Sequence, residues 1–241
     1  ATGLIGDPSG KSKERNLLEG NELKKNTEAI RAQLARFINL EDSKRGLIVN
    51  NYDWLSKISM LDYLRDYGKY FPINYLLNKE IISSRLENGI SYTEFSYNLL
   101  QAIDFLTLYR NHGCRIQVGG SDQWGNLTSG LELIRKVEGG DAKVGVMTSH
   151  LIVDSTGRKF GKSEGGALYL DSEITSPYKL YQYFINVSDA DAIRYLKVFT
   201  FLSREEIETA AKAHEANPGL RQAQKTLAFE VVKIIHGQAR A

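Results

Sequence analysis

The sequence predicts an α/β protein, in which a parallel β-sheet with connecting helices is followed by an α-helical domain. Up to about residue 175, short apolar runs alternate with segments of helical periodicity, and glycine turns follow some of those runs. After Pro177 the helical periodicity continues with little strand signal. We therefore expect a boundary near residue 175, with domains at residues 1–175 and 176–241.

Helices are expected where apolar residues recur every three or four positions. The longest predicted helix stops at Gly113, and Pro218-Gly219 separates two helices near the end of the chain. Ser203 and Glu206 have the spacing of a capping box, which predicts a helix start. In order, the expected helices are 21–38, pieces of 58–87 broken at Gly68 and Pro72, 93–112, 126–137 and pieces of 178–236.

Strands are expected at shorter apolar runs. Residues 47–49 predict a buried parallel strand, residues 115–118 a strand before a glycine turn, and residues 144–153 one or two strands. Residues 2–6 resemble the end of a strand that enters a glycine turn. Because a domain rarely begins at such a point, we expect residues upstream of Ala1 to be absent from this chain.

The composition is that of an ordinary globular protein, with 42% hydrophobic and 25% charged residues among 241. The net charge of +2, from 31 basic and 29 acidic residues, does not indicate a nucleic-acid partner by itself. The single cysteine, Cys114, cannot form an internal disulfide and indicates a reducing compartment. No apolar run has membrane-spanning length, and no signal peptide opens the chain.

The segment from Gly6 to Ser12 resembles a phosphate-binding P-loop, but its glycines are one residue too close together. Pro8 also removes a backbone donor. Two alternatives stay open, namely a solvated turn before a helix, or a basic segment with Lys11, Lys13 and Arg15 that folds over a triphosphate.

Tyr97, Gln101 and Asp104 share one face of a helix that is apolar nearly all round. Buried polar side chains need partners, and a polar ligand would supply them. An internal hydrogen-bond network, or a solvated face of a half-buried helix, would explain the pattern equally well.

Two glycine-rich segments complete the candidate site. Residues 117–124 join a strand to a helix, where Asp122 is placed to bond a ribose or simply to cap the turn. Lys159 and Lys162 lie three residues apart among glycines, and such a pair suits a polyphosphate. The alternative for the lysine pair is a basic, solvent-exposed turn.

Together, in this order and spacing, these segments resemble those of the tyrosyl-tRNA synthetases, class I aminoacyl-tRNA synthetases of the bacterial or organellar type. The resemblance covers essentially the whole chain and implies a Rossmann-like catalytic domain followed by an α-helical domain. Lys159-Phe-Gly-Lys-Ser163 matches this family's form of the KMSKS signature. The other matching segments are Gly3–Lys11, Asn50–Trp54, Thr93–Tyr97 and Gln117–Asn126.

The resemblance also implies a role for each candidate residue. Asp7, Tyr97 and Gln101 would bind the ammonium of the substrate tyrosine, and Asp104 its phenolic hydroxyl. Gln123 would lie near the substrate carboxylate, with Asn51 and Gln117 as further pocket residues. Gly120, Asp122 and Lys162 would bind ATP, and the residues expected to grip the leaving pyrophosphate are Lys159, Lys162, Ser163, Lys11 and Arg15.

The resemblance further implies L-tyrosine, ATP with Mg²⁺ and tRNA(Tyr) as substrates, and no metal site on the protein. It implies a homodimer formed largely through residues 50–95, without membrane attachment, in the cytoplasm or an organellar matrix. The family's HIGH signature and C-terminal tRNA-binding module do not occur in these 241 residues, so the chain is expected to be a fragment of a longer enzyme, and the functional expectation concerns that parent protein.

Three alternatives remain at this stage. A tryptophanyl-type synthetase shares the architecture, although Asp104 favours a substrate with a hydroxyl group. A non-catalytic RNA-binding or splicing cofactor on the same scaffold would be expected to lose the loop lysines or the polar stripe, and both are present. A P-loop nucleotidase is disfavoured by the short glycine spacing.

Overall fold

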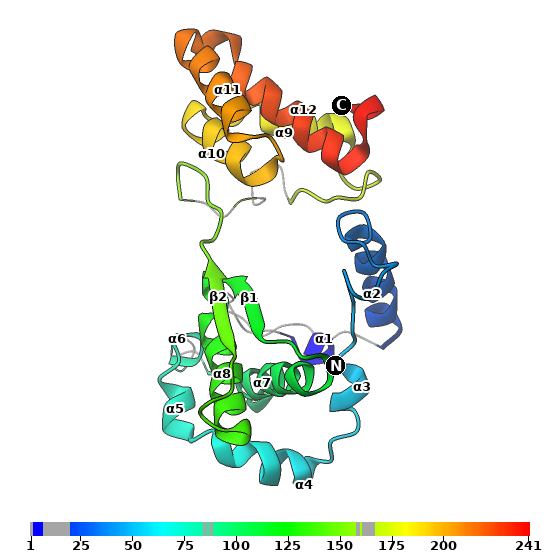
Figure 1. Ribbon diagram of the computed structural model, residues 1–241, viewed down its shortest axis with the longest axis vertical. Helices are drawn as coiled ribbons and strands as arrows, with labels where there is room; N and C mark the ends of the chain where they lie inside the picture. Colours follow the sequence, from blue (N-terminus) through cyan, green and yellow to red (C-terminus); the bar gives the residue numbers. More distant parts are fainter. Residues whose placement is uncertain (1, 7–19, 84–85, 87–88, 158–159, 161–166) are drawn as a thin grey trace. The chain divides into compact units, whose positions relative to one another are not determined.

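The computed structural model describes residues 2–6, 20–83, 86, 89–157, 160 and 167–241 (Figure 1). The chain forms two compact units, Ala1–Leu151 and Ile152–Ala241. Residues 152–175 precede the first helix of the second unit, and apolar side chains from them pack on its core. The domain boundary predicted near residue 175 stays a prediction.

The described part of the first unit contains a two-stranded parallel sheet, formed at two of the predicted strand positions. Strand β1 (Ile116–Gly120) pairs with β2 (Gly145–Ser149), and the register runs from Ile116 opposite Gly145 to Gly120 opposite Ser149. Helix α8 (Trp124–Glu138) connects the two strands and contacts both of them. This strand–helix–strand unit with parallel strands confirms the predicted α/β class.

Helix α7 (Tyr92–His112) forms the centre of the first unit and packs along α8. The Ser91 hydroxyl accepts a hydrogen bond from the backbone N–H of Glu94 at its start, and Gly113 ends it in the left-handed conformation. Gly130 of α8 lets the two helices approach closely, since a side chain there would meet the ring of Phe105. The long helix predicted at residues 93–112 is therefore confirmed.

The segment between the N-terminal region and α7 is helical in short pieces, as its Gly68 and Pro72 predict. One piece is a π-helical turn at Tyr63–Tyr67, followed by a 3₁₀ turn at Gly68–Tyr70. The α-helical pieces are α3 (Tyr52–Leu55), α4 (Met60–Asp62), α5 (Ile73–Leu77) and α6 (Glu80–Ser83).

Two strand predictions in this unit are wrong. Residues 2–6 form a helical turn, α1 (Thr2–Ile5), closed by a hydrogen bond from the Gly6 N–H to the Thr2 carbonyl. Residues 47–49 are extended but unpaired within the described part of the chain, and Leu47 is 55% exposed. An apolar run becomes a strand only beside a partner strand, and the described residues place none there.

Helix α2 (Gly20–Leu34) confirms the helix predicted at residues 21–38, although it ends four residues earlier. Residues 35–38 continue it as hydrogen-bonded turns. None of the described helices combines the length and apolar composition needed to cross a membrane.

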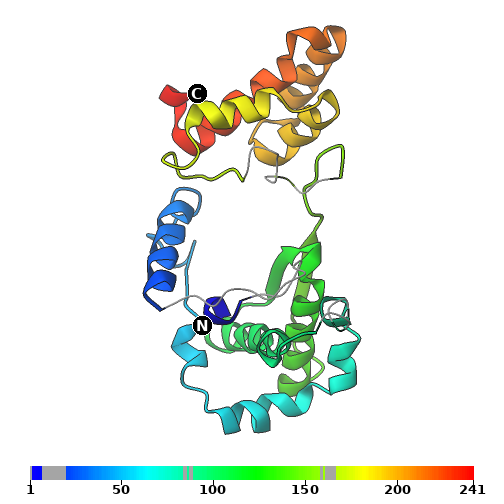
Figure 2. The ribbon, with the colours of Figure 1, turned by 180° about the vertical axis from the view of Figure 1, so that it is seen from behind.

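The second unit is a helical bundle, which confirms the predicted helical region (Figure 2). Ser203 and Glu206 form the predicted capping box at the start of α11, and a 3₁₀ turn at Pro218–Leu220 separates α11 from α12. Tyr195 and Phe184 are among the fully buried side chains of its core. The four helices are α9 (Pro177–Ile185), α10 (Asp189–Phe199), α11 (Arg204–Ala216) and α12 (Gln222–His236).

Candidate functional site

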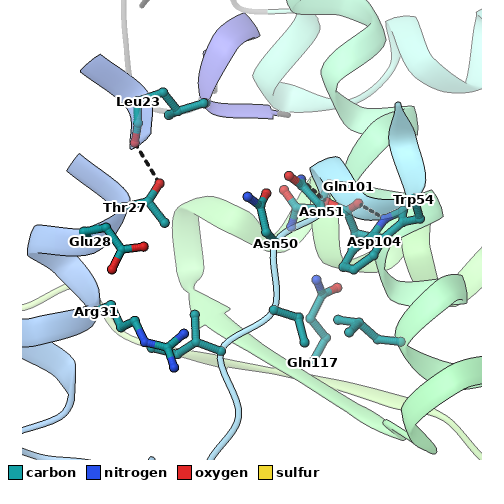
Figure 3. A pocket seen from close by; sticks show the side chains of 14 residues that line it. Leu23, Thr27, Glu28, Arg31, Asn50, Asn51, Trp54, Gln101, Asp104 and Gln117 are labelled. Atoms are coloured by element: carbon teal, nitrogen blue, oxygen red, sulfur yellow. Dashed lines mark hydrogen bonds between the residues drawn. The ribbon is translucent and has the colours of Figure 1, made fainter. Parts of the chain in front are cut away.

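A pocket of about 510 Å³ lies in the first unit beside the polar face of α7 (Figure 3). Several parts of the chain contribute to it. Among them are helix α2, helix α7, strand β1 and the segment that leads into α3. Four of the sequence-predicted residues line it together. These are Asn51, Gln101, Asp104 and Gln117, joined by Gly3, Leu23, Thr27, Glu28, Arg31, Ile48, Val49, Asn50, Trp54 and Leu108.

Asp104 accepts hydrogen bonds from two side chains of this pocket. The Asn51 side-chain amide donates to its Oδ2 at 2.9 Å, and the Trp54 indole N–H donates to its Oδ1 at 2.8 Å. Figure 3 shows these three side chains converging on the pocket wall. Because each carboxylate oxygen has further lone pairs, Asp104 can still accept a hydrogen bond from a ligand.

The pKa of Asp104 is raised above its ordinary value. Burial is the main cause, because it disfavours the charged carboxylate, while the hydrogen bonds from Asn51 and Trp54 act in the opposite direction. The two donors therefore offset part of the effect that burial has on the pKa of this carboxylate.

Gln117 supplies a buried acceptor on the β1 side of the pocket. Within the described part of the chain, its Oε1 atom has no hydrogen-bond partner. Buried polar atoms are nearly always bonded, and an unbonded one in a pocket wall is ready for a ligand donor or a water. Gln101 lies one helical turn before Asp104 and lines the same pocket.

A chain of buried amides fixes Gln123 at the start of α8. The Asn98 amide donates to Asn126 Oδ1 at 2.9 Å, and the Asn126 amide donates to Gln123 Oε1 at 3.1 Å. Asn98 and Asn126 are 5% and 1% exposed. Helix α7 thus orients a side chain that follows the end of β1.

Gly120 and Asp122 lie at the carboxyl end of β1, in the turn that leads to α8. A Cβ atom on Gly120 would lie 2.6 Å from Asp122 Oδ1 and 3.1 Å from a methyl of Leu151. Only glycine therefore lets the Asp122 carboxylate rest against the strand end. This edge of a parallel sheet is where ligands bind in α/β proteins.

The structure brings part of the predicted site together. Tyr97 lies one turn before Gln101 on α7 and is half-buried, but it is not among the residues that line the described pocket. Gly120, Asp122 and Gln123 also lie outside that lining, at the strand end. Six predicted residues fall outside the described part of the chain, namely Asp7, Lys11, Arg15, Lys159, Lys162 and Ser163.

Sequence reasoning missed three residues that shape this region. Trp54 lies within the matching segment Asn50–Trp54, three residues after Asn51. On a helix this spacing places the two side chains on the same face, and it could have indicated that Trp54 belongs to the site. Asn98 and Asn126 gave a weaker signal, since a lone amide on an apolar helix does not reveal its partner. No group of three or more potential metal ligands occurs among the described residues.

Comparisons with known proteins agree with this geometry. The chain is 55% identical over 237 residues to the tyrosine–tRNA ligase of Limosilactobacillus reuteri, covering 98% of this chain and 56% of that protein. It is 54% identical over 239 residues to tyrosine–tRNA ligase 1 of Bacillus subtilis, covering 99% and 57%. The chain therefore spans somewhat more than half the length of these relatives.

Solved structures give the same result for the fold. A C-terminally truncated mitochondrial tyrosyl-tRNA synthetase of Aspergillus nidulans superimposes with a TM-score of 0.80 at 32% identity, covering 100% of this chain and 71% of that one. The corresponding protein of Coccidioides posadasii gives a TM-score of 0.78 at 31% identity, with 98% and 69% covered. The family of class I tRNA synthetases (W and Y) matches residues 1–241, and the chain belongs to this family.

Proposed function

We propose that this chain is the tyrosine-binding part of an enzyme that activates L-tyrosine with ATP and transfers it to tRNA(Tyr). The observation that carries the proposal is Asp104, a half-buried carboxylate held by two donors in the wall of a pocket. The relatives named tyrosine–tRNA ligase, at 54–55% identity, support the same substrate.

Asp104 suits a phenol because its carboxylate accepts a hydrogen bond from the hydroxyl group. A site built around such a bond rejects phenylalanine, since the buried carboxylate then loses a partner, and tyrosyl-tRNA synthetases are themselves a standard example of this kind of rejection. We assign the ammonium of tyrosine to Tyr97, Gln101 and Asp7. Gln123 is assigned to the substrate carboxylate, and the Gln117 Oε1 atom, which has no hydrogen-bond partner among the described residues, can accept a hydrogen bond from the substrate ammonium.

In the activation step, a carboxylate oxygen of tyrosine attacks the α-phosphorus of ATP, and the bond to the pyrophosphate oxygen breaks. No protein nucleophile is needed, so catalysis consists of positioning two anions and stabilising the leaving group. We assign Gly120 and Asp122 to the ribose and Lys11, Arg15, Lys159, Lys162 and Ser163 to the phosphates. Mg²⁺ would arrive with the triphosphate, which is its usual ligand.

We also propose that the chain forms a homodimer through the short helical pieces before α7. Met60, Leu61 and Ile73 are 76%, 74% and 67% exposed, which is unusual for apolar side chains grouped on neighbouring elements. A groove of about 180 Å³, with Leu64 and Tyr92 in its lining, lies in the same region. A second copy of this surface would cover these side chains. The proposed location is the cytoplasm or an organellar matrix.

The test is amino-acid-dependent exchange of pyrophosphate into ATP by the full-length protein. Tyrosine is expected to drive exchange far better than phenylalanine or tryptophan. Exchange driven by tryptophan and not by tyrosine would instead assign the pocket to the other substrate of the family.

A further inference from the structure

The side chain of Asn98, on α7, can adopt only one orientation of its amide. Its Nδ2 donates to Asn126 Oδ1 at 2.9 Å and to the Gly125 backbone carbonyl at 3.3 Å. A backbone carbonyl only accepts hydrogen bonds, so the Asn98 atom that faces it must be the amide nitrogen. Asn98 Oδ1 has no hydrogen-bond partner in the described part of the chain, yet the reverse orientation would set this oxygen against two others. The Gly125 carbonyl therefore fixes the Asn98 amide.

This orientation determines the next two amides on α8. Asn126, which is 1% exposed, turns its Oδ1 toward Asn98 and therefore its Nδ2 toward Gln123. The Gln123 Oε1 atom accepts this hydrogen bond at 3.1 Å. The other end of the Gln123 amide is Nε2, a group that donates hydrogen bonds and does not accept them. A glutamine held only by its stem could present either end, whereas this chain of amides selects one.

The stem of Gln123 is placed by strand β1. A Cβ atom on Gly119 would lie 3.1 Å from Gln123 Cβ and 3.5 Å from Gln123 Cγ. The shorter of these distances is below the optimal separation of two carbon atoms, so the stem lies against the strand because residue 119 has no side chain. Helix α7 thus selects the end of the amide, and β1 sets where that amide lies.

We propose that Asn98 and Asn126 are positioning residues that make Gln123 a hydrogen-bond donor to the carboxylate of the substrate tyrosine. This inference rests on the proposed function, which assigns Gln123 to that carboxylate. A carboxylate only accepts hydrogen bonds, so a Gln123 amide turned the other way would meet it with an oxygen and repel it. The two asparagines hold the favourable orientation before the substrate arrives, which lowers the cost of ordering the site on binding.

The experiment measures dissociation constants by isothermal titration calorimetry on the full-length protein, for L-tyrosine and for tyramine, which lacks the carboxylate. N126L introduces an uncharged side chain of similar size and leaves the Gln123 amide able to turn either way. We expect N126L to weaken tyrosine binding about 10-fold, as for a lost hydrogen bond to a charged group, and tyramine binding by less than about twofold. N98L acts one amide further away and should weaken tyrosine binding roughly threefold.

Two controls separate positioning from general destabilisation. L133V removes a methylene group from a fully buried side chain on the same helix, and it should lower the melting temperature while the ratio of tyrosine to tyramine affinity stays unchanged. In a Q123A background, N126L should change tyrosine binding by less than about twofold, because its effect acts through Gln123. If N126L fails to fold, N98L decides the test, since Asn98 lies on the other helix.

The possible results distinguish the inference from the proposed function. The positioning role is overturned if N126L weakens tyrosine and tyramine equally, if N98L binds tyrosine as wild type does, or if N126L costs the same factor with and without Gln123. Each of these results leaves the proposed function in place. A wild-type protein that binds tyrosine no better than phenylalanine would refute the proposed function and, with it, the inference.

Discussion

At the scale of single residues, the pocket depends on the opposing influences on the pKa of Asp104. The carboxylate is half-buried, and burial alone disfavours its ionised form. Asn51 and Trp54 offset this by donating hydrogen bonds from the preceding segment. We infer that these two side chains matter to the substrate through Asp104 and not only by filling space.

Trp54→Phe tests this role through pH. In the proposed complex the phenol binds the ionised carboxylate, so tyrosine affinity is expected above the pKa of Asp104 and is expected to be lost as pH falls through it. Trp54→Phe removes one of the bonds that lower this pKa, so the loss should begin at higher pH than in wild type. The KM for tyrosine measured across the acid range reports the shift.

The matched control is Tyr52→Phe, which changes an exposed aromatic residue on the same short helix, α3. It should leave unchanged the pH at which the KM for tyrosine begins to rise in the acid range. If Trp54→Phe leaves that pH unchanged, or moves it to a lower value, the role assigned to the indole is contradicted.

At the scale of elements, the helices are fixed by signals local to their ends. Helix α7 ends at Gly113, whose φ of 63° lies in the left-handed region, and the Gly113 and Cys114 N–H groups bond the Tyr109 and Leu108 carbonyls. Both ends of this helix were predictable because serine caps and glycine stops act within one turn of the chain.

Gly113→Ala should lower the free energy of unfolding of the 241-residue chain by about 1 kcal/mol in urea denaturation. An added Cβ meets nothing within 4 Å, so the cost is that of the backbone conformation alone. Gly140→Ala is the control, because its Cβ is equally free and its φ lies outside the left-handed region. Equal effects of the two substitutions would contradict this explanation.

Asp191→Asn tests the start of α10. A pKa lowered from 3.8 to about 2 means that the ionised side chain stabilises the fold above about pH 4, and that this contribution is lost as pH falls toward 2. The variant should lose on the order of 1–2 kcal/mol near pH 7, and its difference from wild type should shrink across that acid window.

Urea denaturation at a series of pH values measures this difference. Glu205→Gln, at an exposed first-turn position of α11, serves as the control and should show a much smaller difference. A wild-type advantage over Asp191→Asn that grows as pH falls would reverse the sign and contradict the assignment.

Strands and tertiary partners were harder to predict than helices, for a physical reason. Residues 47–49 have the composition of a buried strand, yet a strand exists only if a partner strand lies beside it. Gln101 and Asp104, on one face of a helix, predicted a polar site. That Trp54, 50 residues away in sequence, donates a hydrogen bond to Asp104 came only from the fold. Local signals therefore predicted the helices and motifs, and long-range contacts supplied the pocket.

At the scale of the whole molecule, the exposed apolar surface before α7 predicts self-association. Leu61→Glu places a charge on that surface, at a 74% exposed position where burial against a second copy would be costly. We expect the variant to shift from dimer to monomer in analytical ultracentrifugation. Phe201→Glu, at an 89% exposed position in the other unit, should leave the association state unchanged. A wild-type protein that is monomeric at high concentration would contradict the proposed dimer.

The central claim is that Asp104 makes the pocket a tyrosine site. The most direct measurement is the ratio of kcat/KM for tyrosine and phenylalanine in pyrophosphate exchange, compared between wild type and Asp104→Ala in the full-length protein. Loss of a hydrogen bond to a charged partner predicts a fall of about 10- to 100-fold for tyrosine, with little loss for phenylalanine, so that the ratio collapses. An unchanged ratio would contradict the claim.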